Sequence, residues 1–573
     1  MVKQSKVLTP ASRPAFIIHK AAAIFTTALL VATPTAKANS PVKTVDAKPL
    51  GADKLELASL TKTDNLSKRL QAVVESYTSA SSSHVSALIW HPESNQTLVS
   101  YQSKHMMQPA SVTKTLTALL ALDNLQQNKD ENFRYKTQLL SSTPITQYTD
   151  EYGYYSGDLK LVFSGDPSLT SKQLAGLFDH LNALGVKKID GNLYVERDFI
   201  DTSYPAGWVW DDLGICYGAA NKGVVIDGNC IRAQITANDY QQKAEVSLKP
   251  NTEQKRYLGQ ALNQVINIEP DAWFERHSDT QDNPCELSMT LATDNEYQIK
   301  GCFANRLKLP LNLAITDPDS YALTLIDGMT RAFVIGSNNT DGGVIGNSPC
   351  SSANANANAN ANANANAPSL LADTNLIPQV NDNERNSFPF LVAEHQSEPL
   401  NVLIGTMLQK SDNLIAETLL TSVAMQSGLT QQGSYFNRTS AIKQLLKKAG
   451  IESSDSHFVD GSGLSRYNMT SAQHLKQILQ TAYSQYGAEF YNLMPVSGLS
   501  GTLKHKPLYK QQAIKGRVFA KTGSMHGVNN LIGLAKTQSH GDILFVLLEN
   551  GINPADEAMP TLIENMLPEL FID

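Results

Sequence analysis

The feature that most constrains the fold is a helix-like segment with a serine and a lysine three residues apart. Residues 108–122 have the sequence Gln-Pro-Ala-Ser-Val-Thr-Lys-Thr-Leu-Thr-Ala-Leu-Leu-Ala-Leu. Pro109 stands where proline can open a helix, and residues 116–122 are apolar enough to be buried. On a helix, Ser111 and Lys114 share one face. A lysine in a dry pocket can lose its proton, so it can activate a serine hydroxyl as a base.

Two further motifs distinguish this pair from the chance Ser-x-x-Lys that long chains contain. The chain continues with Lys410-Ser-Asp-Asn413 and then with Ala520-Lys-Thr-Gly-Ser524. Alone, Ser-Asp-Asn would be no more than a helix cap. The presence of all three motifs in this order favours a catalytic role for Ser111 and Lys114. About 300 residues separate the first motif from the second, which is too long for a loop, so the insertion holds domains of its own.

The first 38 residues predict a secretory signal peptide. An apolar run at 21–31 precedes Ala36-Lys-Ala38, which matches a cleavage site, and the leader before it is basic, with Lys3, Lys6, Arg13 and Lys20. The run is short for a membrane span, although an uncleaved anchor stays open as an alternative. Cleavage after Ala38 removes five positive charges and no acids, which takes the formal net charge from −7 to −12.

Charge and composition narrow the class of protein. So acidic a surface predicts no nucleic-acid partner, and the acidic and apolar C-terminal end predicts at most a peripheral association with a membrane. We expect an exported protein with no transmembrane segment in the mature chain.

In an oxidising compartment the spacing of the cysteines favours two short-range disulfides, each contributing roughly 3 kcal/mol. The pairs are Cys216 with Cys230 and Cys285 with Cys302, and Cys350 is left free. Metal binding by the cysteines competes with this, but there is no Cys-x-x-Cys and no His-Glu-x-x-His, so we expect no metal.

Periodicity predicts the main elements. A helix is expected over 65–77, a hairpin over 86–91 and 97–101, and two helical stretches that meet at the second motif, over 400–408 and 410–420. Within the insertion we expect strands over 158–163 and 192–195 and a helix over 174–184 that Gly185 stops. Three consecutive antiparallel strands, over 515–522, 530–536 and 542–550, and a last helix over 555–570 complete the chain.

Two segments of the insertion have an unusual composition. Trp208 and Trp210 are either a platform for carbohydrate or, by preference, aromatic core beside the first disulfide. Residues 353–367 alternate Ala and Asn, which cannot build a core, so we expect a disordered surface linker over 351–368. Aggregation is a weaker alternative for that tract.

With these motifs in view, the chain resembles the class C low-molecular-mass penicillin-binding proteins, D-alanyl-D-alanine carboxypeptidases and endopeptidases of the penicillin-binding protein 4 type, the S13 peptidases. The resemblance covers nearly the whole mature chain. It also rests on Gly157-Asp-Leu-Lys-Leu161, Gly165-Asp-Pro-Ser-Leu169, Gly207-Trp-Val-Trp-Asp211, Val225-Ile-Asp-Gly-Asn-Cys230 and Asp460-Gly-Ser-Gly-Leu-Ser-Arg-Tyr-Asn468.

The resemblance implies a mixed α/β (α+β) fold. A penicillin-recognising, transpeptidase and β-lactamase-like domain has an antiparallel sheet flanked by helices and carries nested insertions. We expect the first domain over 39–132 and 395–573, a second over 133–158 and 246–394, and a third, nested in the second, over 159–245. The Ala-Asn tract is not typical of the family.

The motifs imply a role for each residue. Ser111 is the nucleophile, Lys114 takes its proton, Ser411 relays a proton to the departing amine, and Asn413 holds the substrate backbone. Lys521 and the start of the Ser111 helix would help Lys114 to lose its proton.

Further residues are expected to bind the substrate. The backbone N–H groups of Ser111 and Ser524 would form the oxyanion hole. Lys521, Thr522 and Ser524 would bind the terminal carboxylate, and Gly523 would let the substrate approach closely.

The resemblance also places Arg466 and Asp227 at the pocket for the diamino-acid side chain of the peptide, with Asp227 reaching in from the insertion. A surface salt bridge and a turn aspartate are the alternatives for these two residues. His526 stands where relatives carry an uncharged polar residue, so it bears on substrate preference.

The resulting hypothesis is a periplasmic, penicillin-sensitive enzyme that cleaves peptidoglycan stem peptides and crosslinks through an acyl-enzyme, without a cofactor. Its expected partners are those peptides and β-lactams. A β-lactamase, or a non-catalytic protein that binds the cell wall, is the alternative. The second would be expected to have lost Ser111, Lys114 or Lys521, and all three are present.

Overall fold

The structure is a computed structural model that describes residues 52–126, 133–197, 204–219, 221–237, 243–274, 286–303, 308–335, 374–376, 387–430, 436–553 and 559–572. The chain separates into two compact units, Met1–Ala58 and Ser59–Asp573. Only the second is described further. The predicted signal peptide, the Ala-Asn tract, Cys285 and Cys350 lie outside the described residues. No helix among the described residues is long and apolar enough to cross a membrane.

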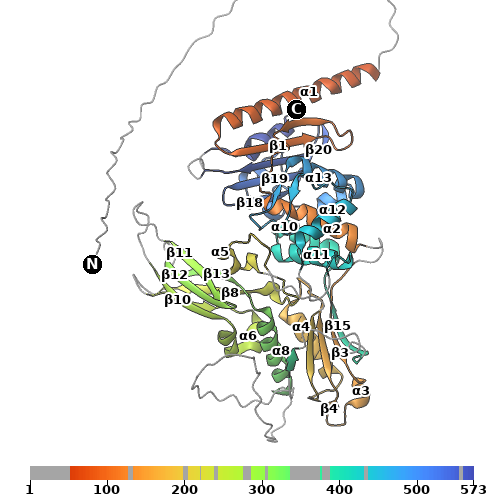
Figure 1. Cartoon of the computed structure of the whole chain (residues 1–573), viewed down its shortest axis with the longest axis vertical. Coiled ribbons are helices and arrows are strands. Elements are labelled where there is room, and N and C mark those ends of the chain that lie inside the picture. The colour runs from red at the N-terminus through yellow and green to blue at the C-terminus, as the bar shows by residue number, and fades with distance from the viewer. Residues whose placement is uncertain are drawn as a thin grey trace, which may run out of the picture. The chain divides into compact units, whose positions relative to one another are not determined.

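A five-stranded antiparallel sheet, here called the main sheet, organises the part of the chain that carries the motifs (Figure 1). Its order is β18-β19-β20-β1-β2, with β1 (His84–Trp90), β2 (Thr97–Tyr101), β18 (Val518–Met525), β19 (Val528–Thr537) and β20 (Gly541–Asn550). All its pairs are antiparallel. The predicted hairpin and the three predicted consecutive strands are therefore confirmed.

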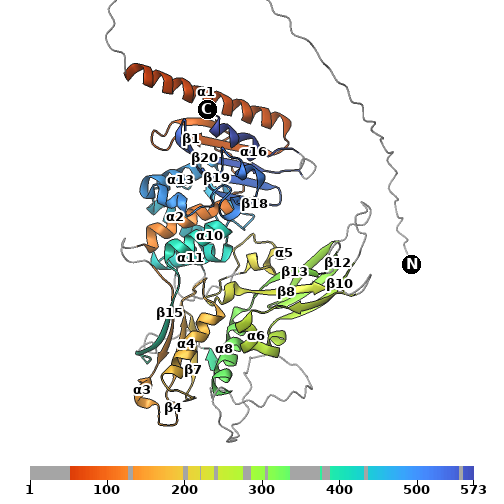
Figure 2. The ribbon, with the colours of Figure 1, turned by 180° about the vertical axis from the view of Figure 1, so that it is seen from behind.

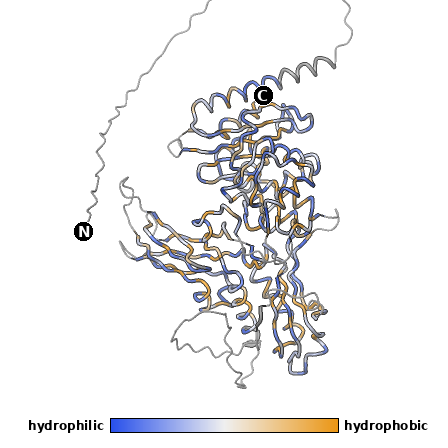
Figure 3. The backbone as a smooth tube through the Cα atoms, viewed as in Figure 1, coloured by the Kyte–Doolittle hydropathy of each residue, from blue (hydrophilic) through white to orange (hydrophobic). Residues whose placement is uncertain are grey.

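Alternation along the strands gives the main sheet two buried faces. In β20, Leu544, Val546 and Leu548 belong to one hydrophobic cluster, and Ile543, Phe545 and Leu547 belong to another. Successive side chains of a strand point to opposite faces, so an unbroken apolar strand predicts cover on both. Figure 3 shows apolar residues along these strands and in the helices packed on them.

Helices from distant parts of the sequence cover the two faces (Figure 2). The first cluster joins the sheet to α2 (Lys114–Leu125), α10 (Leu400–Lys410), α11 (Asn413–Gln426), α12 (Arg438–Lys448) and α13 (Ala472–Tyr486). The second joins it to α1 (Ala52–Ala80), α15 (Pro507–Lys510), α16 (Leu562–Met566) and the 3-10 helix η7 (Pro568–Phe571). The predicted last helix is thus shorter than expected. Every residue of α2 from Lys114 to Leu122 is buried, which marks it as the central helix.

Smaller elements complete this part of the chain. They are the 3-10 helices η1 (Ala110–Thr113) and η5 (Gly501–Leu503), the helix α14 (Ala488–Asn492), and the short strand pair β16 (Ser456–His457) and β17 (Met469–Thr470).

The insertion leaves and returns at one place. Tyr135 N donates to Ser397 Oγ, and Ser397 N donates to the Tyr135 carbonyl, each at 2.9 Å. Tyr135 is followed by β3 (Lys136–Ser141), and Ser397 is preceded by β15 (Phe390–Gln396). These two strands pair with each other. An insertion whose ends lie side by side leaves the host fold intact.

The described residues of the insertion form four sheets. The largest has the order β14-β7-β5-β3-β15, with β5 (Leu159–Phe163), β7 (Leu193–Arg197) and β14 (Thr374–Leu376). Two others are β13-β8-β9 and β10-β12-β11, from β8 (Cys230–Thr236), β9 (Glu245–Leu248), β10 (Asn267–Phe274), β11 (Leu287–Thr293), β12 (Glu296–Phe303) and β13 (Lys308–Ala314). A two-stranded pair joins β4 (Tyr154–Ser156) to β6 (Lys188–Asp190).

The helices of the insertion include two long ones. They are α4 (Ser171–Ala183) and α8 (Pro318–Ile335), beside the shorter α3 (Ile145–Tyr148), α5 (Trp210–Leu213), α6 (Thr252–Leu258), α7 (Leu262–Val265), η2 (Cys216–Gly218), η3 (Asp227–Asn229) and η4 (Gly259–Ala261). The predicted helix 174–184 is α4, and Gly185 follows it with φ 89°. The Cys216–Cys230 disulfide is present, and Cys302 is disulfide-bonded.

The predicted boundary between the second and third domains does not match the sheets. Strand β5 lies on the nested side of residue 158 and pairs with β3 on the other side. Strand β8 pairs with β13, which lies outside the predicted nested segment. Residues 159–245 therefore do not form a separate unit. Motif spacing locates an insertion, but it carries no information on which strands pair across it.

Gly533 is the position in the main sheet at which a side chain is least tolerable. A Cβ there would lie 2.6 Å from the Cα of Ala520 and would also meet the Phe519 carbonyl, both on β18. We predict that Gly533→Ala lowers the free energy of unfolding by about 1–3 kcal/mol through overpacking. Thermal denaturation measures this. The control is Gly176→Ala on α4, where a Cβ has no neighbour within 4 Å, and equal melting temperatures for the two variants would contradict the prediction.

Candidate active site

The first motif forms where η1 runs into α2. Ser111 lies in η1 and Lys114 begins α2, so both side chains share one face of a continuous helical segment. The Lys114 Nζ atom lies 2.9 Å from Ser111 Oγ. Ser111 is half-buried, whereas Lys114 is fully buried. A substrate can therefore reach the hydroxyl but not the amine.

Three segments hold the Lys114 amine. Besides Ser111, its Nζ atom donates to Asn413 Oδ1 and to the Ser462 carbonyl, each at 2.6 Å. A neutral amine has two N–H donors and one lone pair. The contacts therefore fit an amine that donates to Asn413 and Ser462 and accepts the hydroxyl proton of Ser111.

Burial is the main influence on the acidity of Lys114. It lowers the pKa of Lys114 to about 8, against the opposing charges of Asp460, Asp412 and Glu417. We had expected Lys521 and the start of the helix to lower it. Desolvation is instead the largest cause of the lowered pKa, so the exclusion of water from the core is what favours the neutral amine.

The second and third motifs meet at Lys521. Its Nζ atom donates to Ser411 Oγ and to the Thr522 carbonyl, both at 2.9 Å. Burial, followed by the positive charge of Lys114, lowers the pKa of Lys521 well below its ordinary value. Ser411 caps α10 with φ 59°, a left-handed conformation that costs roughly 1–3 kcal/mol for a residue other than glycine. This backbone conformation directs the Ser411 hydroxyl toward the amine of Lys521.

Two asparagines fix the loop that precedes the nucleophile. The Asn530 Nδ2 atom donates to the carbonyls of Gln108 and Pro109, each at 2.9 Å. The Asn550 Oδ1 atom accepts from Gln108 N at 2.7 Å. Ala110, the next residue, is buried in a left-handed conformation with φ 49°. Side chains of the main sheet thereby fix the backbone just before η1. No local sequence pattern indicates this role for the two asparagines.

Strand β18 packs directly on η1 at Gly523. A Cβ at Gly523 would lie 2.5 Å from the Pro109 carbonyl oxygen and 3.2 Å from Val112 N. The glycine therefore allows β18 to approach the nucleophile segment, whereas we had expected it to admit the substrate. Ser524, the next residue, is exposed, and Thr522 Oγ1 donates to Thr502 Oγ1 at 2.9 Å.

Comparison with known proteins identifies the family. The family model described as D-Ala-D-Ala carboxypeptidase 3 (S13) matches residues 66–340 and 372–567, which include all three motifs. This is more than half of the chain. The chain belongs to the S13 family. It is accordingly a serine D-Ala-D-Ala carboxypeptidase, as the motifs predicted, and the mixed α/β fold is confirmed.

Two relatives and a solved structure support the S13 assignment. The D-alanyl-D-alanine carboxypeptidase DacB of Haemophilus influenzae is 30% identical over 466 residues, 81% of this chain and 84% of that protein. The penicillin-sensitive carboxypeptidase A of Dictyostelium discoideum is 25% identical, over 74% of this chain and 73% of its own length. The crystal structure of penicillin binding protein 4 (dacB) from Haemophilus influenzae matches with a TM-score of 0.66 and 26% identity, covering 85% of this chain and 95% of that one.

In this S13 peptidase the amide of Asn413 is already occupied. Its Oδ1 atom accepts from Lys114, and its Nδ2 atom donates to the Tyr217 carbonyl at 2.8 Å. To hold a substrate backbone, the amide would have to exchange the Tyr217 contact for it. Tyr217 belongs to the insertion, so the insertion reaches the site through this bond.

A segment of the insertion docks on the loop that holds Lys114. Trp208 Nε1 donates to Asp460 Oδ2 at 2.8 Å, and Ser465 Oγ donates to the Ala206 carbonyl at 2.6 Å. Asp460 also accepts from the backbone N–H groups of Gly463 and Ser465. Trp208 is buried, as a core residue would be, but its polar contact is with Asp460. Trp210 is 80% exposed, so the prediction that it belongs to the core is wrong.

Arg466 lies beside the nucleophile segment. Its carbonyl accepts from Gln108 Nε2 at 3.0 Å, and its Nη1 atom lies 3.5 Å from the His526 carbonyl. Its charge also opposes the rise in the pKa of Tyr217, which burial and a hydrogen bond to Asp212 produce. The structure therefore brings Arg466 and His526 to the site.

Asp227 does not lie there, so the expectation that it reaches into the cleft is corrected. Its carboxylate accepts from Ser171 N, Asn251 Nδ2 and Gln254 Nε2, at 3.0–3.1 Å. These partners all belong to the insertion. A short Asp-Gly motif carries no information on the direction of its side chain. Asp212, which we had not predicted, accepts a hydrogen bond from the Tyr217 hydroxyl, and the charge of Arg466 acts on the same tyrosine.

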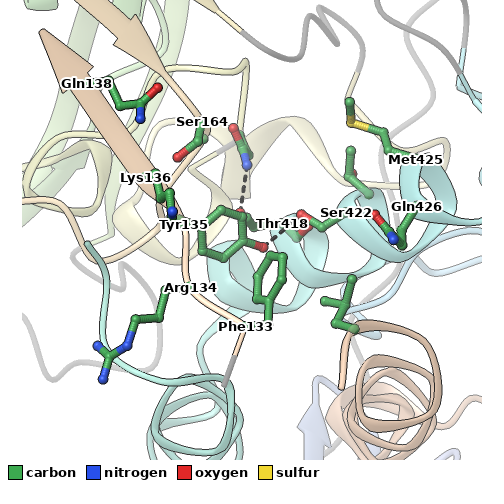
Figure 4. A pocket seen from close by; sticks show the side chains of 14 residues that line it. Phe133, Arg134, Tyr135, Lys136, Gln138, Ser164, Thr418, Ser422, Met425 and Gln426 are labelled. Atoms are coloured by element: carbon green, nitrogen blue, oxygen red, sulfur yellow. Dashed lines mark hydrogen bonds between the residues drawn. The ribbon is translucent and has the colours of Figure 1, made fainter. Parts of the chain in front are cut away.

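A separate cavity of about 510 Å³ lies where the insertion meets α11 (Figure 4). Tyr135 and Ser422 point toward one another in it, with their hydroxyl oxygens 2.7 Å apart. Asn221 from the insertion donates to Thr418 Oγ1 at 2.7 Å. No predicted site residue lines this cavity. Among the described residues, no cluster of His, Cys, Asp and Glu could hold a metal.

The pKa of Lys114 predicts how acylation depends on pH. Only the neutral amine can accept the Ser111 proton, so the acylation rate should rise with pH through about 8 and fall about tenfold per pH unit below it. Stopped-flow measurement of acylation by a fluorescent penicillin between pH 5.5 and 9.5 tests this decrease, which is the acidic limb of the pH–rate profile. A rate that does not change below pH 8 would contradict a buried lysine base.

Proposed function

We propose that this S13 carboxypeptidase removes the terminal D-alanine of peptidoglycan stem peptides through an acyl-enzyme on Ser111. The contact between the Lys114 amine and the Ser111 hydroxyl, with the amine buried and its pKa lowered, carries the proposal. The Ser111 oxygen attacks the carbonyl of the penultimate D-alanine while its proton passes to Lys114. The C–N bond then breaks, and the terminal D-alanine leaves as a free amino acid.

The departing amine needs a proton. Ser411, whose hydroxyl accepts from Lys521, gives its proton to the amine and is reprotonated by the proton that Lys114 took from Ser111. This relay leaves Lys114 neutral again. Water then attacks the Ser111 ester, the carboxylate product leaves, and the hydroxyl is regenerated. Lys114 serves as base for this water as it did for the serine.

Lys521, Thr522 and Ser524 bind the terminal carboxylate in this proposal. A substrate carboxylate favours the protonated form of Lys521, whose positive charge in turn opposes protonation of the neutral Lys114 amine. Substrate binding and activation of the base thus support each other. The backbone N–H groups of Ser111 and Ser524 form the oxyanion hole, which contributes about 3 kcal/mol for each donor. Gly523 contributes by letting these two segments approach.

The same acyl-enzyme supports an endopeptidase activity. If a diamino acid of a neighbouring stem replaces the terminal D-alanine as leaving group, the crosslink is cut by the same bond changes. We propose both activities, with the substrate in the periplasm, where the signal peptide at 1–38 would deliver the enzyme. β-Lactams acylate Ser111 in the same way; the penicillin binding protein 4 of Haemophilus influenzae has been crystallised with one.

We assign the diamino-acid pocket to Arg466 and Asp212. The acid and the cation both act on Tyr217, whose carbonyl contacts Asn413. A side chain with a free ammonium and a free carboxylate would find an opposite charge for each. Asp212 takes the role that the sequence had suggested for Asp227.

Mass spectrometry of the penicillin adduct tests the nucleophile. We predict that benzylpenicillin labels Ser111 in the wild type, that Ser111→Ala is unlabelled, and that Lys114→Ala is folded but acylated at least about 100-fold more slowly. A label on another residue would overturn the assignment of Ser111. Near-normal acylation of Lys114→Ala would overturn the assignment of Lys114 as the base.

Kinetics on two substrates test the pocket. Asp212→Ala and Arg466→Ala should each lower kcat/KM for a diamino-acid stem peptide about tenfold, as for a lost charged hydrogen bond. Benzylpenicillin has no such side chain, so its acylation rate should change less than twofold. Asp227→Ala is the control: it should lower the melting temperature, because three donors lose their acceptor, and leave both rates unchanged. Equal losses on peptide and penicillin would contradict the pocket.

A further inference from the structure

A buried carboxylate lies behind the catalytic lysine. Glu417 is on α11 one turn after Asn413, and residues four apart share a helix face. It is 4% exposed and does not contact Ser111, Ser411 or Lys521 through any hydrogen bond of the described residues. None of the three motifs includes it.

The carboxylate holds the turn that contacts the lysine. The Oε1 atom of Glu417 accepts from Gly461 N at 2.9 Å and from Ser462 N at 2.8 Å. The carbonyl of the same Ser462 accepts from Lys114 Nζ at 2.6 Å. From the other side, Thr117 Oγ1 of α2 donates to the Gly461 carbonyl at 2.6 Å. The turn is thus fixed between α11 and α2, and its position depends on both.

We propose that Glu417 is a positioning residue for Lys114. Its carboxylate holds the Gly461-Ser462 turn so that the Ser462 carbonyl meets the lysine amine, and its negative charge favours the protonated amine. This inference rests on the proposed function, in which Lys114 is the base. Two separable effects follow: the reach of the side chain sets the geometry of the amine, and the charge sets the pH at which the amine becomes a base.

The other carboxylate oxygen faces a cation, which suggests a purely structural alternative. The Oε2 atom lies 3.5 Å from Arg438 Nε, and both residues are buried. A structural ion pair would affect the stability of the fold, but its loss would not change the pH midpoint of the acylation rate. The two roles therefore differ in a measurable quantity.

The charges around both groups fix the sign of the expected shift. Asp460, Asp412 and Glu417 raise the pKa of Lys114, and the charge of Lys114 in turn contributes to the lowered pKa of Lys521. Burial and Asp460 raise the pKa of Glu417 to about 7, and Arg438 opposes them. Two backbone N–H donors and the guanidinium of Arg438 face the carboxylate of Glu417 and favour its ionised form. Removal of its charge should therefore move the acidic limb of acylation to lower pH.

Four variants of the mature chain separate charge from reach. Glu417→Gln keeps an acceptor oxygen without the charge, Glu417→Asp keeps the charge with a shorter reach, and Glu417→Ala loses both. The matched control is Glu196→Gln, which removes a buried carboxylate 3.1 Å from Lys160 in the insertion. The acylation rate constant with fluorescent benzylpenicillin is measured from pH 5.5 to 9.5, together with the melting temperature.

For Glu417→Gln we expect the midpoint of the limb to fall by about one pH unit, with the plateau rate within about threefold of wild type. Glu417→Asp should keep the midpoint and lose about tenfold in plateau rate, and Glu417→Ala should show both changes. Glu196→Gln should lower the melting temperature and leave the midpoint and plateau of the limb unchanged.

An unmoved midpoint in Glu417→Gln, with a loss of melting temperature like that of Glu196→Gln, would overturn the proposal in favour of the ion pair. If Glu417→Gln does not fold, Glu417→Asp decides: a wild-type plateau rate would contradict the positioning role. A wild type without any acidic limb would instead contradict Lys114 as the base. Failure of the proposed function is thus distinguished from failure of this inference.

Discussion

The structure depends on one buried amine. Lys114 is placed in a dry core between three segments that are far apart in the chain, and each offers it one oxygen: Ser111, Asn413 and Ser462. An unpaired ammonium in such a place would be prohibitively costly, and the fold meets this by supplying acceptors and by lowering the pKa until the proton is easily lost. Burial thereby favours the neutral amine, the form that can accept a proton.

The surrounding fold supplies the rigidity that this arrangement requires. Glycines and asparagines of the main sheet hold the nucleophile segment from one side: Gly523 allows β18 to touch η1, and Asn530 and Asn550 fix the loop before it. Strain is accepted at two positions next to the reacting groups, Ala110 and Ser411, both left-handed. Such strain persists only where neighbouring contacts over-determine the backbone, as they do here.

The insertion is part of the same machinery. It leaves and returns through the paired residues Tyr135 and Ser397, yet it also contacts the site through the Tyr217 carbonyl and through Trp208 on Asp460. Asp460 in turn caps the turn that presents Ser462 to the lysine. The insertion therefore directly contacts Asn413 and the Asp460 loop, the two segments that supply Lys114 with its acceptors besides Ser111.

The sequence by itself determined the chemistry and most of the local structure. Three motifs in fixed order identified the nucleophile, the base and the second lysine, since helical spacing alone places Ser111 and Lys114 on one face. Alternation gave the hairpin and the three consecutive strands, and cysteine spacing gave the Cys216–Cys230 disulfide. These features depend on neighbours within a few residues or on chemistry that only certain side chains can perform.

Only the tertiary structure decided what depends on distant contacts. It gave Asp227 partners within the insertion, and it showed that Asp212 and Arg466 both act on Tyr217. It also joined strands across the predicted domain boundary and placed Glu417 against the turn that contacts the lysine. It also assigned the low pKa of Lys114 chiefly to burial. The direction of a side chain from a turn, the pairing of strands and the dryness of a pocket are set by residues tens to hundreds of positions away, and no local pattern encodes them.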